Sequence, residues 1–336
     1  TTHTPVPAGH NRFDPATVEH CLGRYLDAFG DEGRERMLAL GLEPGQDVFN
    51  MTTLGIRGAR HHNGVSRIHG EVAARNEREL WPEIPPEENP VEHVTNGVHL
   101  QTFMALEWTN FLDTRFPEWR TRTSEPAFWN CIDEIPDHRF WSIRHELKLR
   151  LLEDVRRRLE AQHRRAGTAQ ATLDRIVAQL RRPDRRLLVM GFARRFATYK
   201  RALLMLSDPQ RLARILGDPE RPVVLVVAGK AHPNDEPGQA ILRRVHALAH
   251  DPAFVGHLLL VENYDLAMAR RLVAGVDLWI NTPEYPMEAC GTSGMKAAVN
   301  GGVNLSMLDG WWAEAFDGEN GWGIRPHDMS RGPEYC

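Results

Sequence analysis

A single lysine, Lys296, lies within an otherwise small and mostly apolar segment, MEACGTSGMKAAVNGG, at residues 287–302. Gly291 and Thr292 favour the start of a helix just before it, because glycine frees the backbone and threonine is a good N-cap. The unpaired N–H groups at such a helix start favour an anion, phosphate especially. Lys296 would lie one turn further along the same face, about 5–6 Å away. This spacing suits pyridoxal phosphate, which carries its phosphate arm and its aldehyde on adjacent ring carbons.

The amine of Lys296 would form a Schiff base with that aldehyde. Because its neighbours are Ala, Val, Met and Gly, the amine should be desolvated, which disfavours its charged form and makes it a better nucleophile. The alternative is an ordinary lysine that extends its amine to solvent from a helix packed on a sheet. The spacing alone favours this alternative, so other residues must decide between the two.

A second candidate site is the basic segment GFARRFATYKR at residues 191–201. It brings four cations into a short stretch: Arg194, Arg195, Lys200 and Arg201. Arginine offers a planar fork and lysine a point charge for oxyanions, so the segment is typical of a phosphate clamp. Two phosphates held close together would repel each other and would require several such cations. A solvated basic loop is the competing interpretation.

Two Asn-Gly pairs, at Asn63 and Asn96, are the third candidate. Such pairs most often form tight turns and nothing more. Asn96 is the better candidate for ligand binding, because it stands at the presumed domain junction, where clefts form. His3 is uninformative in isolation. The histidines show no zinc-binding spacing, and neither a GxSxG motif nor a GxxxxGK[ST] phosphate loop is present.

The second half of the chain shows the elements that would position these residues. Short apolar runs alternate with amphipathic helical patterns, which predicts a doubly wound α/β domain with a parallel sheet covered on both faces. Ligands bind outside the carboxyl ends of the strands in such sheets, so chemistry is expected just after each strand. The predicted strands are residues 187–192, 222–228, 257–261, 276–280 and 303–308, and the predicted helices are 198–216, 236–250 and 266–273.

The first half differs in character. Residues 14–40 look helical, and residues 103–182 form a Trp-rich helical region. Its arginines at 156–158 and 164–165 could form a nucleic-acid patch, but interspersed acidic residues favour a solvated helix face. We expect a domain junction near residues 96–101. The predicted division is therefore residues 1–95 and residues 96–336, with 103–182 as a helical insertion in the second domain.

Composition narrows the class of protein. The 336 residues carry a formal net charge of −4, so no overall positive field favours nucleic acid or an anionic membrane as a partner. No apolar run approaches the roughly 20 residues of a membrane helix. The four cysteines, Cys21, Cys131, Cys290 and Cys336, contain no CxxC pair, which fits a reducing cytoplasm. A first residue that is not methionine suggests a fragment of a longer protein.

Taken together, the motifs resemble the α-glucan phosphorylases, the family of glycogen, starch and maltodextrin phosphorylases. The opening THTPVPAG and the later LDGWW look most like the bacterial short type. The resemblance implies a glycosyltransferase-B architecture, of which this chain is a central fragment. The matching segments are THTPVPAG (2–9), NMT (50–52), NGVSRIH (63–69), VTNG (94–97), GFARRFATYKR (191–201), ENY (262–264), EACGTSGMK (288–296) and LDGWW (308–312).

The resemblance implies reversible phosphorolysis: a terminal α-1,4-linked glucose and orthophosphate give glucose 1-phosphate and a shortened α-1,4-glucan. Lys296 matches the lysine that carries pyridoxal 5'-phosphate, whose phosphate group acts as general acid/base toward the substrate phosphate. By the same matching, Arg195, Lys200 and His3 join Lys296 as catalytic residues, and Arg195 and Lys200 bind the substrate phosphate. The remaining cofactor-binding positions are Arg194, Gly291, Thr292 and Tyr264.

For the glucosyl unit, the resemblance implies binding by His3, Asn96, Glu288, Cys290 and Gly291, and retention of the anomeric configuration. It also implies a cytoplasmic homodimer for the full-length protein. Phe103 stands where the family has tryptophan, and Cys290 replaces a serine of some relatives. Two alternatives are a nucleotide-sugar-dependent glycosyltransferase of the same fold and an inactive glucan-binding fragment. The first commonly has a second glutamate where this chain has Lys296.

Overall fold

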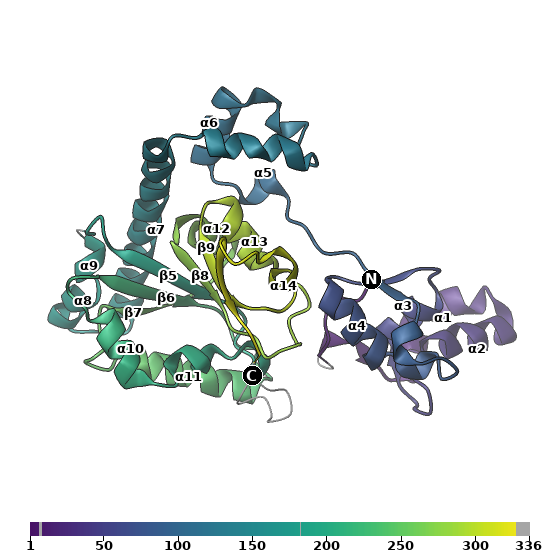
Figure 1. Cartoon of the computed structure of the whole chain (residues 1–336). Helices are drawn as coiled ribbons and strands as arrows, with labels where there is room; N and C mark the ends of the chain where they lie inside the picture. Colours follow the sequence, from purple (N-terminus) through teal and green to yellow (C-terminus); the bar gives the residue numbers. More distant parts are fainter. Residues whose placement is uncertain (7–8, 182, 327–336) are drawn as a thin grey trace.

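The computed structural model describes residues 1–6, 9–181 and 183–326. Residues 7 and 8 of the opening motif, and Cys336, lie outside the described residues. Figure 1 shows two lobes joined by one extended segment. That segment, residues 94–99, forms neither helix nor strand. The smaller lobe precedes it and the larger lobe follows it.

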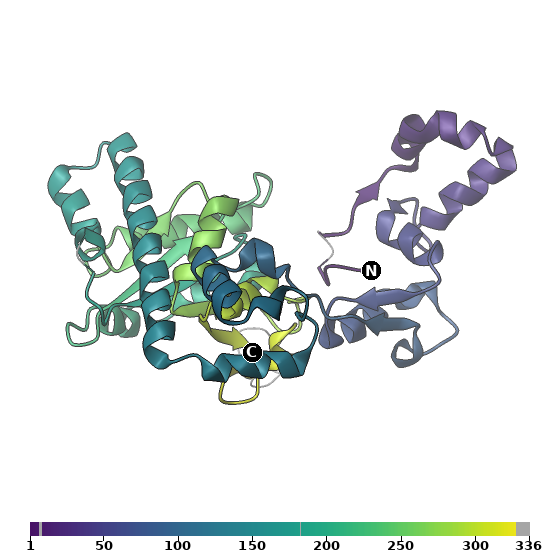
Figure 2. The same cartoon turned by 90° about the horizontal axis from the view of Figure 1, so that it is seen from above.

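The described part of the smaller lobe combines two short sheets with four α-helices. Strand β1 (Arg12–Phe13) pairs antiparallel with β2 (Phe49–Asn50), and β3 (His62–Gly64) pairs parallel with β4 (Val91–His93). The prediction that residues 14–40 are helical is confirmed, as two helices that extend to the outer end of the lobe (Figure 2). The helices are α1 (Pro15–Asp27), α2 (Gly30–Gly41), α3 (Met51–Arg57) and α4 (Arg67–Asn76), with 3-10 turns η2 (Arg78–Leu80) and η3 (Pro86–Glu88).

A six-stranded parallel sheet forms the centre of the larger lobe, in the order β10-β9-β8-β5-β6-β7. All five predicted strands are present, and the predicted doubly wound α/β fold is confirmed. The sixth strand, β10, was not predicted, because glycines interrupt its apolar residues and it lies at the edge of the sheet. The strands are β5 (Leu188–Ala193), β6 (Val223–Ala228), β7 (Leu258–Val261), β8 (Leu278–Asn281), β9 (Val303–Met307) and β10 (Gly321–Ile324).

Helices cover both faces of this sheet (Figure 1). On one face, Leu151 of α7 (Asp137–Arg165) and Leu272 of α12 (Leu266–Gly275) belong to the same buried cluster as Val226 of β6. On the other face, α10 (Pro209–Leu216) and α11 (Glu236–Ala249) contribute to a second cluster. The long helix of region 103–182 is thus a layer of the α/β fold, because it supplies much of one core.

The remaining helical segments of the larger lobe surround this frame. Residues 100–134 form most of the Trp-rich cluster, in which Trp119 is completely buried. The elements are α5 (Leu100–Phe103), α6 (Leu106–Arg115), η4 (Pro117–Arg120), η5 (Pro126–Glu134), α8 (Gln170–Ile176), α9 (Ala178–Arg181), α13 (Thr292–Val299) and α14 (Trp312–Ala315).

One predicted helix is wrong in detail. Residues 198–216 form η6 (Thr198–Lys200), η7 (Ala202–Leu206) and only then α10. Arg201 between the two 3-10 turns adopts a left-handed backbone with φ 48°. Asp208 then caps α10, whose first residue is proline, and a residue before proline disfavours helical geometry. The pattern of apolar residues continued across these breaks and concealed them.

The arginines of α7 are ion-paired with nearby acidic side chains. Arg156 contacts Glu153 and Glu160, and Arg158 contacts Asp265. This pairing favours the solvated helix face over a nucleic-acid patch. A separate finding concerns membranes: among the described residues, no helix is long and apolar enough to cross one.

Candidate functional site

The candidate site lies where the order of strands in the sheet reverses. The chain runs from β5 through β6 to β7 on one side, then returns to β8, which pairs with the other side of β5. In parallel sheets the crevice at such a switch point is where ligands bind. The basic segment follows β5 and the loop 282–291 follows β8, so two candidate segments meet at this crevice.

A cavity of ≈ 390 Å³ occupies the crevice. It gathers nearly all of the predicted site residues, although they come from four separate parts of the sequence. Tyr264 is the exception: it packs against the core cluster of the α7 face, and its burial raises its pKa while the nearby Arg194 acts in the opposite sense. The predicted residues that line the cavity are His3, Asn96, Arg194, Arg195, Lys200, Glu288, Cys290, Gly291, Thr292 and Lys296.

Glu288 is the electrostatic centre of this cavity. Arg194 Nη1 and Lys200 Nζ both donate to its Oε2, at 2.8 and 2.7 Å. Burial by itself raises the pKa of Glu288, but the attraction of the two cations and their hydrogen bonds outweigh it and lower the pKa to about 2. The two cations predicted to bind phosphates therefore converge on one anionic oxygen in this structure.

Arg195 differs from its neighbour Arg194. Its side chain is exposed at the cavity, whereas Arg194 is 8% exposed. Arg195 has no ion pair or side-chain hydrogen bond with another residue in the described part of the chain. Its guanidinium can therefore bind an incoming anion without first breaking an ion pair with a carboxylate.

Helix α13 begins at the cavity, and its cap differs from the prediction. Gly291, with φ 84°, is the N-cap, and Thr292 is the first helical residue. The left-handed conformation explains the difference, because glycine adopts it without the steric cost that a threonine would meet. Thr292 and Ser293 of the first turn line the cavity, and Lys296 still lies one turn further along.

The amine of Lys296 is partly buried, and the residue lines the cavity. Burial lowers its pKa, which increases the share of neutral, nucleophilic amine. Its Nζ lies 4.0 Å from the centre of the Phe103 ring, and this cation–π contact favours the charged form and partly offsets the effect of burial. Phe103, the residue that departs from the family pattern, is thus in direct contact with the candidate cofactor lysine.

Asn300 holds Phe103 in that position. It is fully buried at the end of α13, and its side chain bonds to Phe103 O and to Ala105 N, both at 2.8 Å. The same amide donates to Lys296 O at 2.8 Å. One buried amide therefore connects α5 with α13 across the base of the site.

Cys290 is a poor nucleophile in this setting. Its thiol is buried, and burial raises the pKa to about 11, although main-chain hydrogen bonding to Asn96 acts in the opposite sense. The thiol is therefore protonated at neutral pH. This residue contributes shape and main-chain groups to the cavity, in line with the backbone role that the resemblance implies.

The smaller lobe supplies His3 and one wall of the cavity. Thr2 N donates to Asn63 O at 3.0 Å, and Asn76 Nδ2 donates to Pro5 O at 3.1 Å, so the start of the chain is fixed on β3 and α4. The Asn63-Gly64 pair thus has a structural role. These bonds lie on either side of His3 and help to position it.

Between described residues, two side-chain contacts connect the lobes, and a third holds the linking segment on the larger lobe. Ser66 Oγ donates to Ala289 O at 2.6 Å. Glu314 accepts from Arg67 N at 2.9 Å and from the Thr95 hydroxyl at 2.7 Å. Sequence reasoning missed the roles of Ser66, Glu314 and the buried Asp309. Asp309 lies two residues after the end of β9, but this position does not indicate that its partner is Glu288.

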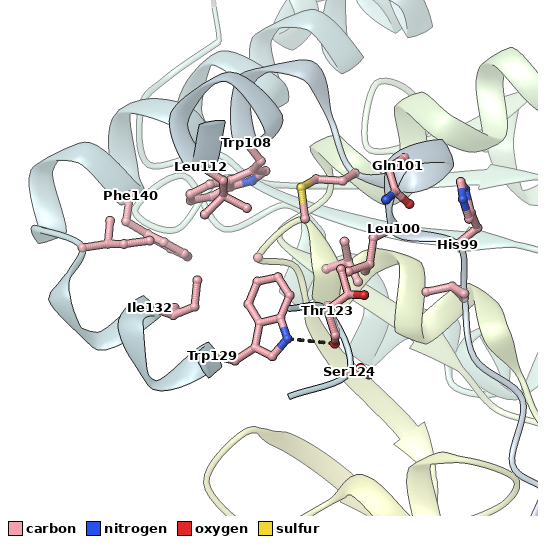
Figure 3. A pocket seen from close by; sticks show the side chains of 16 residues that line it. His99, Leu100, Gln101, Trp108, Leu112, Thr123, Ser124, Trp129, Ile132 and Phe140 are labelled. Carbon is pink, nitrogen blue, oxygen red and sulfur yellow. Dashed lines mark hydrogen bonds between the residues drawn. The ribbon is translucent and has the colours of Figure 1, made fainter. Parts of the chain in front are cut away.

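A second, apolar cavity lies on the other side of α13. It measures ≈ 630 Å³, and no Asp, Glu, Lys or Arg is among the described residues that line it. Figure 3 shows Trp108, Trp129 and Phe140 around it, with Trp129 donating to the Thr123 carbonyl at 3.1 Å. A cavity without charged lining residues is unsuited to phosphate, so the smaller crevice, with Arg194, Arg195 and Lys200, is the better candidate for an anion.

The chain is similar to known proteins over nearly its whole length. A model of the carbohydrate phosphorylase family matches residues 24–317. The chain is 43% identical to the maltodextrin phosphorylase of Thermococcus litoralis over 99% of its length, and 44% identical to the glycogen phosphorylase of Mycobacterium bovis over 98%. It is 38% identical to the glycogen phosphorylase of Aquifex aeolicus. It spans only 38%, 38% and 47% of these three relatives, respectively, and is thus a fragment by comparison. The chain belongs to the carbohydrate phosphorylase family.

Proposed function

We propose that this chain is the central, catalytic part of an α-1,4-glucan phosphorylase that releases terminal glucose as glucose 1-phosphate with orthophosphate as co-substrate. One observation carries the proposal. Arg194 and Lys200 converge on one oxygen 2.8 and 2.7 Å away, in the same cavity as exposed Arg195, the start of α13 and Lys296. Family membership supports the same reaction class.

The residues present fit pyridoxal 5'-phosphate. Lys296 offers a partly desolvated amine, and the start of α13 at Gly291 and Thr292 offers main-chain donors for a phosphate. Arg194 adds a buried positive charge. This charge lies close enough to Tyr264 to act on the pKa of its hydroxyl, in the lowering direction. When bound covalently through Lys296, the cofactor would supply a phosphate group that acts as general acid/base toward orthophosphate.

The chain's own residues would bind and orient the substrates. Arg195 would grip orthophosphate with its planar fork, and Lys200 would add a point charge beside it. The cations would offset the repulsion between two neighbouring phosphates and stabilise charge at the reacting centre. His3 and Asn96 from the amino-terminal side, with Glu288 and main-chain groups of Cys290 and Gly291, would bind the glucosyl unit.

The wider organisation is part of the same proposal. Residues 1–95 would complete the amino-terminal domain of the full-length enzyme, and residues 96–336 would belong to the cofactor-binding domain. A cytoplasmic location and a homodimer follow from the resemblance. Contacts from Ser66 and Glu314 support a functional pairing of the two lobes, because they join the lobes beside the cavity.

The test uses protein extended to its natural ends. Borohydride reduction followed by peptide mass spectrometry should place the cofactor on Lys296, and Lys296→Ala should abolish both the adduct and phosphate-dependent glucan cleavage. Lys230→Ala is the matched control, since Lys230 lies beyond the end of β6 but lines a different cavity. It should keep the adduct.

Two results would contradict the proposal. A reduced wild-type protein with no modification on Lys296 would remove the cofactor assignment. Glucose transfer from a nucleotide donor without orthophosphate would instead identify a glycosyltransferase of the same fold.

A further inference from the structure

The LDGWW motif at residues 308–312 has no role in the reaction as described above, yet its aspartate is almost completely buried. Asp309 is 1% exposed. Its Oδ2 accepts a hydrogen bond from Glu288 N at 2.9 Å, and its Oδ1 accepts one from Gly310 N at 2.8 Å. Both carboxylate oxygens are thus engaged, and one of them holds the main chain of the residue proposed to bind the sugar.

The neighbours of Asp309 hold the same loop at a second point. Trp311 N donates to Cys290 O at 2.9 Å. Gly310 has φ 54°, and a Cβ built on it would lie within 2.3 Å of Cys290 O. Only glycine permits this close approach. The loop is therefore fixed at Glu288 by a side chain and at Cys290 by main-chain contacts.

We propose that Asp309 is a positioning residue for the glucosyl-binding loop: it fixes the main chain at Glu288 and so sets the direction of the Glu288 carboxylate. The inference rests on the proposed function. In the described part of the chain the carboxylate of Asp309 accepts hydrogen bonds from main-chain N–H groups at Glu288 and Gly310, and Lys200 acts on it through its charge, so the glucosyl-binding loop should be affected first. Loss of Asp309 should weaken glucan binding and leave the cofactor in place.

The ionised form of Asp309 is the one that fits this role, because two N–H donors face its two oxygens. A protonated carboxyl group would direct a hydroxyl at one of those donors and lose that bond. Burial and the nearby charge of Glu288 raise the pKa of Asp309, with burial the larger cause. The two main-chain donors and Lys200 lower it, and the resulting pKa is about 7. Tyr285 is a further titratable group that interacts with Asp309. Positioning should therefore weaken as the pH falls below about 7.

The test is Asp309→Asn in the full-length holoenzyme. Asparagine keeps the shape but turns an NH₂ toward one of the two donors, so the KM for glucan at saturating orthophosphate should rise about tenfold. The KM for orthophosphate and the cofactor content should change little. The ratio of mutant to wild-type KM for glucan should shrink as the pH falls below 7, because the wild type then loses the same bond.

The control is Asp317→Asn, in an exposed turn of the same region, which should leave both KM values unchanged. If Asp309→Asn does not fold, Gly310→Ala can be used, because it disturbs the same loop at its contact with Cys290. It should likewise raise the KM for glucan and leave the KM for orthophosphate little changed. An equal rise in both KM values together with a loss of bound cofactor would overturn the inference. An unchanged KM for glucan would also overturn it. An inactive wild-type protein would instead refute the proposed function.

Discussion

Replacing Glu288 by glutamine should destabilise the larger lobe although it removes only one charge. The carboxylate is 5% exposed, and the side chains of Arg194 and Lys200 that it pairs with are 6% and 14% exposed. Glutamine retains the shape and one acceptor but leaves two largely buried cations without a negative partner. Because both cations are mostly buried, water can compensate them only in part.

The structure sets the size of the effect. A shift of the Glu288 pKa from its ordinary 4.5 to about 2 corresponds to about 3 kcal/mol of stabilisation of the folded state. Breaking a buried ion pair by removal of one partner costs roughly 3–5 kcal/mol, which agrees. Because the folded-state pKa is depressed, this stabilisation is fully present above pH about 4.5 and is lost as the pH falls through about 2.

Thermal unfolding followed by circular dichroism at pH 7 measures the change, which should be a decrease in Tm of about 6 °C for a lobe of this size. Added orthophosphate should raise the Tm of Glu288→Gln more than that of wild type, since an anion can replace the missing carboxylate. Glu32→Gln, in an exposed helix pair with Arg36, is the control and should leave the Tm unchanged. An unchanged Tm for Glu288→Gln would refute the reasoning.

Two further predictions concern the same loop. Gly291→Ala should lower the free energy of unfolding by about 1 kcal/mol, because alanine is strained at φ 84°. Urea titration measures this change, and a gain in stability would contradict the assignment of Gly291 as the N-cap. In a Cys336→Ser background at pH 8, the thiol of Cys290, with its pKa of about 11, should react with Ellman's reagent far more slowly than exposed Cys21. Equal rates would show that the loop opens readily.

Local patterns were sufficient to predict the frame of the larger lobe. Five strands were predicted because each is a short apolar run, and burial on both faces of a parallel sheet requires such runs. The breaks within residues 198–216 were missed because apolar spacing continues through them. The edge strand β10 was missed because a strand with one neighbour and alternating glycines has little apolar signal.

The site residues divide in a similar way. Lys296, the basic segment and Asn96 were predicted from residue type, spacing and position, and the family resemblance added His3 and Glu288. Asp309 and Glu314 could not be recognised as important in the same manner. Their partners lie 21 and 247 residues away in the chain, at Glu288 N and Arg67 N.

The sequence by itself determined which segments become strands and helices, and which side chains could hold a phosphate or carry a cofactor, because both depend on neighbours within a few residues. Tertiary structure alone decided that β8 lies beside β5 and that residues from both lobes share one cavity. It also decided that two cations beside Glu288 lower its pKa to about 2, whereas burial raises the pKa of Asp309 to about 7. The physical reason is that solvent exclusion and the distance between charges are properties of the packed fold, whereas conformational preference is largely a property of the local chain.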